Sequence, residues 1–381
     1  MNHQGTRITR RTLPRDASYH NPKDSPLCGL VLAGGEGKRL RSFIHLLRQD
    51  SLPKQYVNFI GRRSMMEHAL HRAETLIPSN RVFVIINQGH LNFPEVAEQV
   101  SRRPPETVIV QPENKETGPG ILFPLMHIAK RYPNAIVALL PSDHFVLEEE
   151  ELMRCVRLAY LLVRRDASRV VMLAVEPDHD ESEYGYILPH RKLNSGKRLA
   201  STISSFVEKP DPSQARQLML GGALWNTMIM VFKIDTLVHL VKDISPALCD
   251  VFRPVYQAIG TPDEETVMRE TYQRLTPINF SKAIVEPLVQ THPSSLLALP
   301  VRNVLWSDWG SESRVMEVLR KTGYASRLNG LATATQQPRT MARDSEPPFF
   351  ERSQTPKSVR VKNRSRETQQ RALRMAPGSA L

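Results

Sequence analysis

The sequence has few cysteines, few aromatic residues and no long apolar run. Its three cysteines lie far apart in 381 residues without metal-type spacing, so we expect the reduced, buried thiols of a cytoplasmic protein. The chain contains no apolar run of about 18 residues, and we therefore expect no membrane-spanning helix. Charges near the start are followed by no apolar stretch, so we expect no secretory signal peptide. A hydrophobic content of 40% still permits a sizeable core.

Acidic residues are in the minority, and the excess positive charge is unevenly distributed. The formal charge is +12, of which residues 1–26 carry +3 and residues 325–381 carry +7. Only +2 remains for residues 27–324, which argues against nucleic acid as the main partner. The basic tail is either a solvated segment or a loose contact for an anionic surface.

The same boundaries appear in the distribution of apolar residues. Residues 1–26 lack apolar periodicity, and residues 325–381 contain too few apolar side chains to offset the entropy of ordering. We therefore predict a disordered basic head over 1–26, one globular domain over 27–324 and a disordered basic tail over 325–381.

Strands and helices alternate along the predicted domain, which favours an α/β fold with a mainly parallel sheet covered on both faces. After residue 176 the alternation breaks, and we expect an inserted mixed region there. We expect strands at 30–33, 82–86, 108–110, 135–140, 170–175, 184–188, 203–207 and 228–232. Helices are expected behind a Ser64–Glu67 capping box and at 120–131, 149–164, 212–220, 235–242, 246–259 and 262–274.

A glycine-rich segment, Leu-Val-Leu-Ala-Gly-Gly-Glu-Gly-Lys-Arg at residues 30–39, is the most informative part of the chain. Its glycines let the backbone turn tightly after a strand, and backbone N–H groups with basic side chains can cradle phosphate. The segment is not a Walker loop, because that motif needs glycine at the position of Leu32 and serine or threonine at the position of Arg39. It is not a dinucleotide fingerprint either, because that motif needs a glycine at the position of Leu40. An ordinary glycine turn is the alternative.

Two aspartates occupy distinctive positions. Asp143 directly follows the strand expected at 135–140, where α/β sheets place their ligands. Its carboxylate could bind Mg²⁺ or cap the next helix. Asp308 lies between two tryptophans in Trp-Ser-Asp-Trp-Gly, where it could bind a cation or form an Asx turn.

Several further polar segments could contact a nucleotide or a sugar phosphate. Gln111 could donate to and accept from a base edge, and glycines such as Gly185 permit close approach. Glu208 could accept from sugar hydroxyls while Lys209 pairs with a phosphate. A polar loop, an exposed hairpin and a strand end are the alternatives for these segments.

Taken in order, these segments resemble the motifs of the sugar nucleotidyltransferases. The closest resemblance is to the mannose-1-phosphate guanylyltransferase branch, which opens with Gly-Gly-x-Gly-x-Arg-Leu followed by Pro-Lys-Gln, here at residues 53–55. The resemblance extends from about Leu27 to about Glu317. It implies a doubly wound, Rossmann-like fold with an inserted sugar-binding region. It also implies an enzyme that joins a nucleoside triphosphate to a sugar 1-phosphate and releases pyrophosphate, with GTP and mannose 1-phosphate favoured.

The resemblance also implies roles for individual residues. Catalytic roles would fall to Arg39, Lys54, Asp143 and Lys209, with Arg39 and Lys54 holding the triphosphate. Asp143 and Asp308 would bind Mg²⁺. The nucleotide would contact Ala33, Gly34, Gly35, Gly37, Arg39, Lys54, Gln111 and Gly118, and the sugar phosphate would contact Tyr184, Gly185, Glu208, Lys209 and Asn226. A sugar phosphate is already ionised at neutral pH, so we expect no general base. These motifs contain no Ser–His or Cys–His constellation, so we also expect no covalent intermediate.

The chain departs from the family pattern at several places. Glu116 stands where small or basic residues are common. Met228 replaces a glycine after Trp-Asn, the segment 279–286 loses an aspartate, and we expect an eleven-residue loop between Leu40 and Leu52. A glucose-1-phosphate enzyme using UTP or dTTP therefore stays open, as does a catalytically idle sugar-nucleotide sensor. A homo-oligomer is also open.

Overall fold

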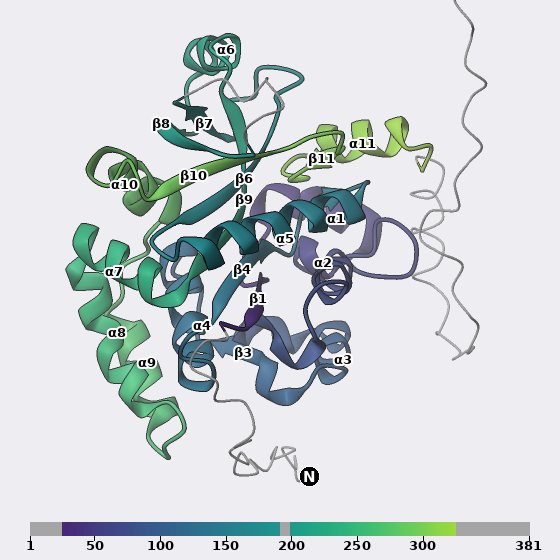
Figure 1. Ribbon diagram of the computed structural model, residues 1–381. Helices are drawn as coiled ribbons and strands as arrows, with labels where there is room; N and C mark the ends of the chain where they lie inside the picture. Colours follow the sequence, from purple (N-terminus) through teal and green to yellow (C-terminus); the bar gives the residue numbers. More distant parts are fainter. Residues whose placement is uncertain (1–24, 191–198, 325–381) are drawn as a thin grey trace, which may run out of the picture. The chain divides into compact units, whose positions relative to one another are not determined.

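A nine-stranded sheet forms the centre of the computed structural model, which describes residues 25–190 and 199–324 (Figure 1). The strands are β1 (Leu27–Leu32), β2 (Val82–Asn87), β3 (Val108–Gln111), β4 (Ile136–Pro141), β6 (Val170–Val175), β7 (Gly185–Pro189), β8 (Ser201–Glu208), β9 (Leu224–Lys233) and β10 (Leu296–Val301). Their order across the sheet is β3-β2-β1-β4-β9-β6-β10-β8-β7.

Most of these strands run in one direction. β1 pairs in parallel with both β2 and β4, β2 with β3, and β6 with β10. β9 runs antiparallel between β4 and β6, and β8 runs antiparallel to β10 and β7. Every residue of β2, β4 and β6 is buried, as expected where helices cover both faces of a sheet. The α/β fold predicted from the sequence is confirmed.

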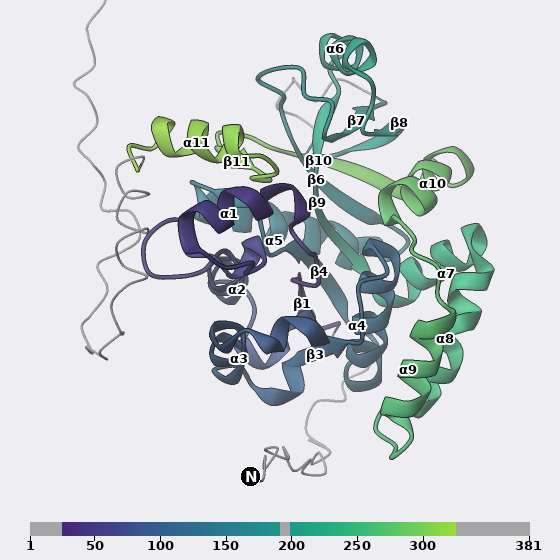
Figure 2. The same ribbon diagram turned by 180° about the vertical axis from the view of Figure 1, so that it is seen from behind.

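Helices cover the two faces of the sheet (Figures 1 and 2). On one face lie α2 (Met65–Glu74) and α5 (Glu149–Arg165), and on the other lie α4 (Thr117–Arg131) and α7 (Ile234–Ile244). The apolar core on the α4 side joins strand residues such as Leu30 and Leu139 to Ile121 and Leu237. The remaining helices are α1 (Arg41–Arg48), α3 (Pro94–Ser101), α6 (Pro212–Leu220), α8 (Pro246–Ala258), α9 (Glu264–Arg274), α10 (Glu286–Thr291) and α11 (Glu312–Lys321).

A second, two-stranded sheet joins segments that are far apart in the sequence. Strand β5 (Phe145–Val146) pairs antiparallel with β11 (Trp306–Ser307). Backbone hydrogen bonding continues beyond the pair, since Leu147 N donates to Leu305 O at 3.0 Å. Asp143 and Asp308, separated by 165 residues, consequently flank one small sheet.

Several predictions from the sequence are confirmed and others are corrected. The strand at 170–175 and the helix at 212–220 have the predicted bounds, and the Ser64–Glu67 capping box is present. The loop predicted between Leu40 and Leu52 is wrong, because α1 occupies most of it and buries Phe43 and Ile44. Strand β10 and the two-stranded sheet were not predicted.

Two further predictions concern the membrane and the ends of the chain. Among the described helices, none combines the length and apolar character needed to cross a membrane. Residues 1–24 and 325–381, which hold nearly all of the predicted disordered head and tail, lie outside the described residues. Those two predictions stay predictions.

Candidate active site

The turn after β1 presents backbone donors without protein acceptors. Within residues 25–190 and 199–324, the N–H groups of residues 34–37 donate to no protein atom. Gly35 is exposed, and Gly37 has a φ of +58°, which a residue with a Cβ adopts at a cost. A row of free N–H groups beside Lys38 and Arg39 is suited to binding an anion.

Buried amide side chains support this turn from below. Gln55 Nε2 donates to the carbonyls of Ala33 at 2.8 Å and Gly35 at 2.7 Å. A Cβ at Gly34 would lie 2.5 Å from Gln111 Nε2, so only glycine fits there without displacing that amide. The carbonyls of the turn are thus held inward, and its N–H groups are left on the open side.

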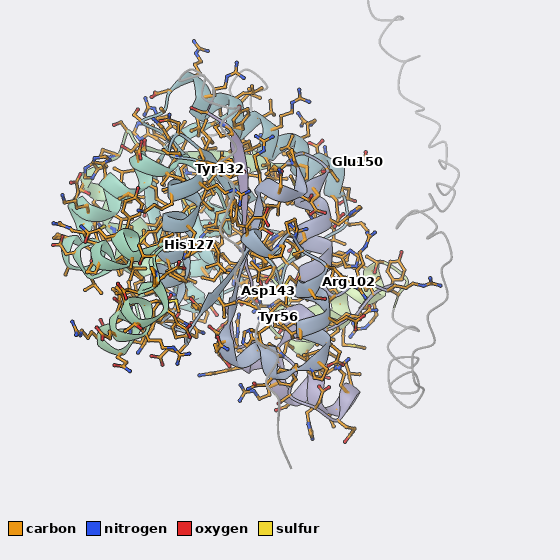
Figure 3. The ribbon with its side chains drawn as sticks, turned by 90° about the horizontal axis from the view of Figure 1, so that it is seen from below. Tyr56, Arg102, His127, Tyr132, Asp143 and Glu150 are labelled. Atoms are coloured by element: carbon orange, nitrogen blue, oxygen red, sulfur yellow. The ribbon has the colours of Figure 1, made fainter. Side chains whose placement is uncertain are left out.

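Lys54 joins the two aspartate segments. Its side chain is only 7% exposed, and Nζ lies 2.9 Å from Asp143 Oδ2. The same ammonium donates to the carbonyl of Asp308 at 2.7 Å and approaches that of Trp309 at 3.3 Å. Figure 3 labels Asp143 and also Tyr56, which lies two residues beyond Lys54. Lys54 therefore lies between the predicted metal ligands, with all three of its ammonium donors near protein oxygens.

Asp143 is an ionised carboxylate at the carboxyl end of β4. It does not cap a helix, because α5 begins at Glu149 and its N-cap is Glu148. Burial alone would raise the pKa of Asp143, but the ammonium of Lys54 outweighs it and holds the pKa below its usual value.

His144, the next residue, is held as a neutral ring. Burial lowers the pKa of His144 to about 4. Trp306 Nε1 donates to its Nδ1 at 3.3 Å, so the proton of the neutral ring lies on Nε2, which is 3.8 Å from Asp143 Oδ1. Because Nδ1 is already an acceptor for the indole, this nitrogen is not positioned as a general base.

The carboxylate of Asp308 is used asymmetrically. Oδ1 accepts from Gly310 N at 2.8 Å, from Tyr184 Oη at 3.0 Å and from Arg314 Nη1. Oδ2 has a single longer contact among the described residues, from Arg39 Nη2 at 3.4 Å. The Asx turn considered from the sequence is present. Burial would raise the pKa of Asp308, but Lys54 and Arg314 outweigh it and lower the pKa to about 2.

Arg39 extends from the glycine turn toward the segment before β7. Its side chain is 49% exposed, and Nη1 lies 2.7 Å from Glu183 Oε2. Together with its contact to Asp308, this ion pair links the predicted nucleotide side to the predicted sugar side. A phosphate ligand at Arg39 would compete with both carboxylates.

The predicted sugar-phosphate residues gather where β7, β8 and β9 meet. Gly185 is paired with Glu208, and a Cβ at Gly185 would lie 2.7 Å from Glu208 Oε2 and 3.4 Å from the Cβ of Asn226. Lys209 is exposed with a φ of +50°. The carbonyl of Tyr184 accepts from Lys209 N at 3.2 Å, so the structure brings the five residues together. The side chain of Tyr184 is buried and directs its hydroxyl to Asp308.

Two residues predicted to contact the base are packed against the protein. Gln111 is 2% exposed, donates to Asn87 Oδ1 at 2.7 Å and accepts from Tyr272 Oη at 3.3 Å. Gly118 N donates to Ile278 O at 2.7 Å, and a Cβ at Gly118 would lie 2.9 Å from that oxygen. Both residues therefore have structural partners, and their contact with a nucleotide stays a prediction.

The donor set fits Mg²⁺. Asp143 Oδ1 and Asp308 Oδ2 each lack a short bond to the described protein atoms, so each carboxylate keeps one oxygen available. In the part of the chain that is described, no group of three or more His, Cys, Asp or Glu side chains is arranged to hold a metal. Magnesium is commonly held by one or two carboxylates, with water and phosphate oxygens completing its coordination.

Sequence reasoning missed Arg314 and Glu183. Arg314 lies in the first turn of α11, where the helix dipole disfavours a cation, and that placement was a usable signal. Glu183 carried no such signal, because its pairing with Arg39 depends on how two distant segments pack.

Comparisons with known proteins identify the family of this chain. The family model described as "Nucleotidyl transferase" matches residues 28–324. The mannose-1-phosphate guanylyltransferase of Salmonella montevideo is 27% identical over 302 residues, covering 77% of this chain and 60% of the relative. The xanthan biosynthesis protein XanB of Xanthomonas campestris pv. campestris is 23% identical over 312 residues, covering 80% of this chain and 62% of the relative. The chain thus spans about three-fifths of the length of these relatives.

Solved structures share the fold. A mannose-1-phosphate geranyltransferase from Thermus thermophilus superposes with a TM-score of 0.61 at 21% identity, covering 74% of this chain and 76% of that protein. A mannose-6-phosphate isomerase from Helicobacter pylori gives a TM-score of 0.55 at 17% identity, covering 74% and 99%. At these identities the likeness concerns the architecture.

Proposed function

This chain belongs to the nucleotidyl transferase family, and on that premise we propose that it joins a nucleoside triphosphate to a sugar 1-phosphate and releases pyrophosphate. We favour GTP and mannose 1-phosphate, because curated relatives with the name mannose-1-phosphate guanylyltransferase align with up to 80% of the chain. Their identities of 24% to 27% leave the base and the sugar to experiment.

One observation carries the proposal. The ammonium of Lys54 lies within 2.9 Å of the Asp143 carboxylate and 2.7 Å of the Asp308 carbonyl. Lys54 packs against Gly37, in a turn whose N–H groups at 34–37 donate to no atom of the described residues. Phosphoryl chemistry needs positioned positive charge and anion-binding donors more than it needs a nucleophilic side chain. In this proposal the turn supplies the donors and Lys54 the positive charge, beside the two aspartate segments that would hold the metal.

In this proposal the N–H groups of residues 34–37 and the guanidinium of Arg39 bind the triphosphate. Asp143 and Asp308 would hold Mg²⁺, which when bound supplies positive charge to phosphate oxygens. Glu208 and Asn226 orient the sugar, and Lys209 pairs with its phosphate. Holding the reactants in line can contribute roughly 7–11 kcal/mol to lowering the barrier. The sugar phosphate is the nucleophile and is already ionised, so His144 can stay neutral.

The direct test is a substrate matrix. The full chain would be incubated with Mg²⁺, with GTP, UTP, dTTP, ATP or CTP, and with mannose 1-phosphate or glucose 1-phosphate, and pyrophosphate release would be measured. We expect the highest kcat/KM for GTP with mannose 1-phosphate. A higher kcat/KM for glucose 1-phosphate with UTP or dTTP would support the proposed reaction but show that the proposed base and sugar are wrong.

Matched variants separate the site from the rest of the molecule. Asp143→Asn should reduce kcat by at least about 100-fold, since it removes a carboxylate that would hold the Mg²⁺ whose positive charge is needed at the reacting phosphates. Asp263→Asn, an exposed aspartate at the start of α9, should behave as the wild type. If the wild type releases no pyrophosphate with any substrate pair but binds a nucleotide sugar, the chain is a sugar-nucleotide sensor and not an enzyme.

A further inference from the structure

The two oxygens of Asp308 have unequal surroundings. Oδ1 accepts from three donors, Gly310 N, Tyr184 Oη and Arg314 Nη1, whereas Oδ2 has only the 3.4 Å contact to Arg39 among the described residues. A carboxylate held in this way cannot rotate without breaking several hydrogen bonds at once. Its other oxygen therefore points in one direction, toward Arg39.

Arg314 is the charged member of that set and is itself tightly held. Its side chain is 10% exposed, and Nε lies 3.2 Å from Glu181 Oε2. The guanidinium carbon lies 4.7 Å from the ring centroid of Tyr184, the residue whose hydroxyl also contacts Asp308. Arg314 thus contacts Asp308 through Nη1, Glu181 through Nε and the ring of Tyr184 through the face of its guanidinium group. A lysine ammonium cannot make these three contacts at once.

The position of Arg314 is costly to the helix that carries it. Ser311 caps α11 and accepts from Arg314 N, which places the guanidinium at the end of the helix where a cation is disfavoured. Gly310 makes room for the contact, because a Cβ there would lie 2.5 Å from Asp308 Oδ2 and 2.9 Å from Arg314 Nη1. Local helix preferences do not explain this arrangement, whereas the contact with Asp308 does.

We propose that Arg314 is a positioning residue for the metal site: with Tyr184 and Gly310 it occupies Oδ1 of Asp308 and so directs Oδ2 toward the cation. The inference rests on the proposed function, which assigns Asp308 to Mg²⁺. It adds that Arg314 on α11, held by Glu181, orients the Asp308 carboxylate without contacting the substrate.

Two effects of Arg314 on metal binding have opposite signs, which makes the proposal testable. As a nearby positive charge, Arg314 repels a divalent cation, and its removal would tighten metal binding. As an orienting group it favours binding, and partners of metal ligands typically contribute about 10–100-fold to affinity. The sign of the change therefore distinguishes orientation from simple electrostatics.

The experiment measures Mn²⁺ binding to the full chain without substrates, by electron paramagnetic resonance of the free ion. Arg314→Gln should raise the Mn²⁺ dissociation constant by about 10–100-fold. Arg314→Lys should restore little of that affinity despite keeping the charge. Guanidinium ion added to Arg314→Ala should restore part of it, because the ion can occupy the vacated site.

Controls identify which idea fails. Arg320→Gln removes an exposed cation from the same helix and should leave the dissociation constant unchanged. If Asp308→Asn weakens Mn²⁺ binding while Arg314→Gln binds as tightly as the wild type or more tightly, the positioning role is wrong and the metal site stands. If Asp308→Asn has no effect, the metal assignment itself is wrong. Should Arg314→Gln fail to fold, Tyr184→Phe decides, with weaker Mn²⁺ binding expected and unchanged binding contradicting the proposal.

Discussion

Lys54 is a buried cation surrounded by protein oxygens, and its replacement tests how the site is held together. Lys54→Met removes the partner of the Asp143 carboxylate and the donor to the Asp308 carbonyl. Leaving such groups unpaired costs about 1–3 kcal/mol, so the free energy of unfolding in urea should fall by that amount, and turnover should be lost. Lys242→Met, at an exposed position on α7, should change neither. An unaltered free energy of unfolding for Lys54→Met would contradict the observed contacts.

Asp308 should make stability depend on acid pH in a predictable direction. Its pKa of about 2 in the folded protein lies below the value of about 3.9 for an unfolded aspartate. A lowered pKa contributes stability above about pH 4, here roughly 2–3 kcal/mol, and the contribution is lost as the pH falls toward 2.

The measurement compares urea unfolding of the wild type and Asp308→Asn from pH 7 to pH 3 in the presence of a chelator. The gap between the two free energies of unfolding should narrow below about pH 4. Asp263→Asn serves as the control, and its gap to the wild type should stay constant. A gap for Asp308→Asn that widens as the pH falls would show that the sign of the pKa shift is wrong.

Among the elements, the short β5–β11 pair brings the two aspartate segments together. Trp306 of β11 donates to His144 Nδ1, and His144 in turn lies beside Asp143. Trp306→Phe keeps an aromatic ring near Tyr184 but removes the donor that fixes the tautomer of His144. We expect kcat to fall about tenfold, the lower end for partners of metal ligands. The free energy of unfolding in urea should fall by about 1–3 kcal/mol, because the acceptor on His144 loses its donor.

The tautomer can be followed directly by ¹⁵N NMR of His144. Trp306→Phe should shift the ring away from the Nε2–H form. Trp309→Phe is the comparison, because the indole nitrogen of Trp309 has no acceptor among the described residues, and the His144 tautomer should not change in it. If the His144 signal is identical in Trp306→Phe and the wild type, Trp306 does not fix the tautomer of His144.

How far the sequence predicts these elements depends on their length and local signals. Strand β6 is six consecutive buried apolar residues, and its predicted bounds are confirmed. Strand β10 is equally apolar but contains Pro300, which argues against a strand in a sheet interior. Helix α1 has no capping side chain at Leu40, and so its start carries no signal. Strands β5 and β11 have two residues each, too few for any period to appear.

The candidate site divides in the same way. The positions of Asp143 after β4 and of the glycines after β1 follow from local sequence, because parallel strands place their carboxyl ends at one edge. The surroundings of Asp308 depend on Tyr184 and Arg314, which only the packed chain brings to it. The partners of Gln111 likewise depend on packing, since its buried amide contacts Asn87 and Tyr272, and its predicted contact with a base stays a prediction.

At the scale of the whole molecule, charge and chemistry belong to different parts of the chain. The residues assigned to the site all lie between residues 33 and 314, in a domain with a formal charge of only +2. Residues 325–381 carry +7, and their composition predicts a solvated segment. We therefore expect catalysis and any attraction to polyanions to be separable.

Deleting residues 325–381 tests that separation. The deletion should leave kcat and KM within about twofold of the full chain, because a solvated tail of this composition contributes no packed contact to the site. It should lower the formal charge from +12 to +5 and elute earlier from heparin, since retention depends on the number of cationic contacts. A variant of the full chain with its tail Lys and Arg changed to Gln should elute like the deletion and turn over like the wild type. Loss of turnover in the deletion alone would mean that the tail contributes to the folded domain through its apolar residues, and loss in both would place its cations at the substrate.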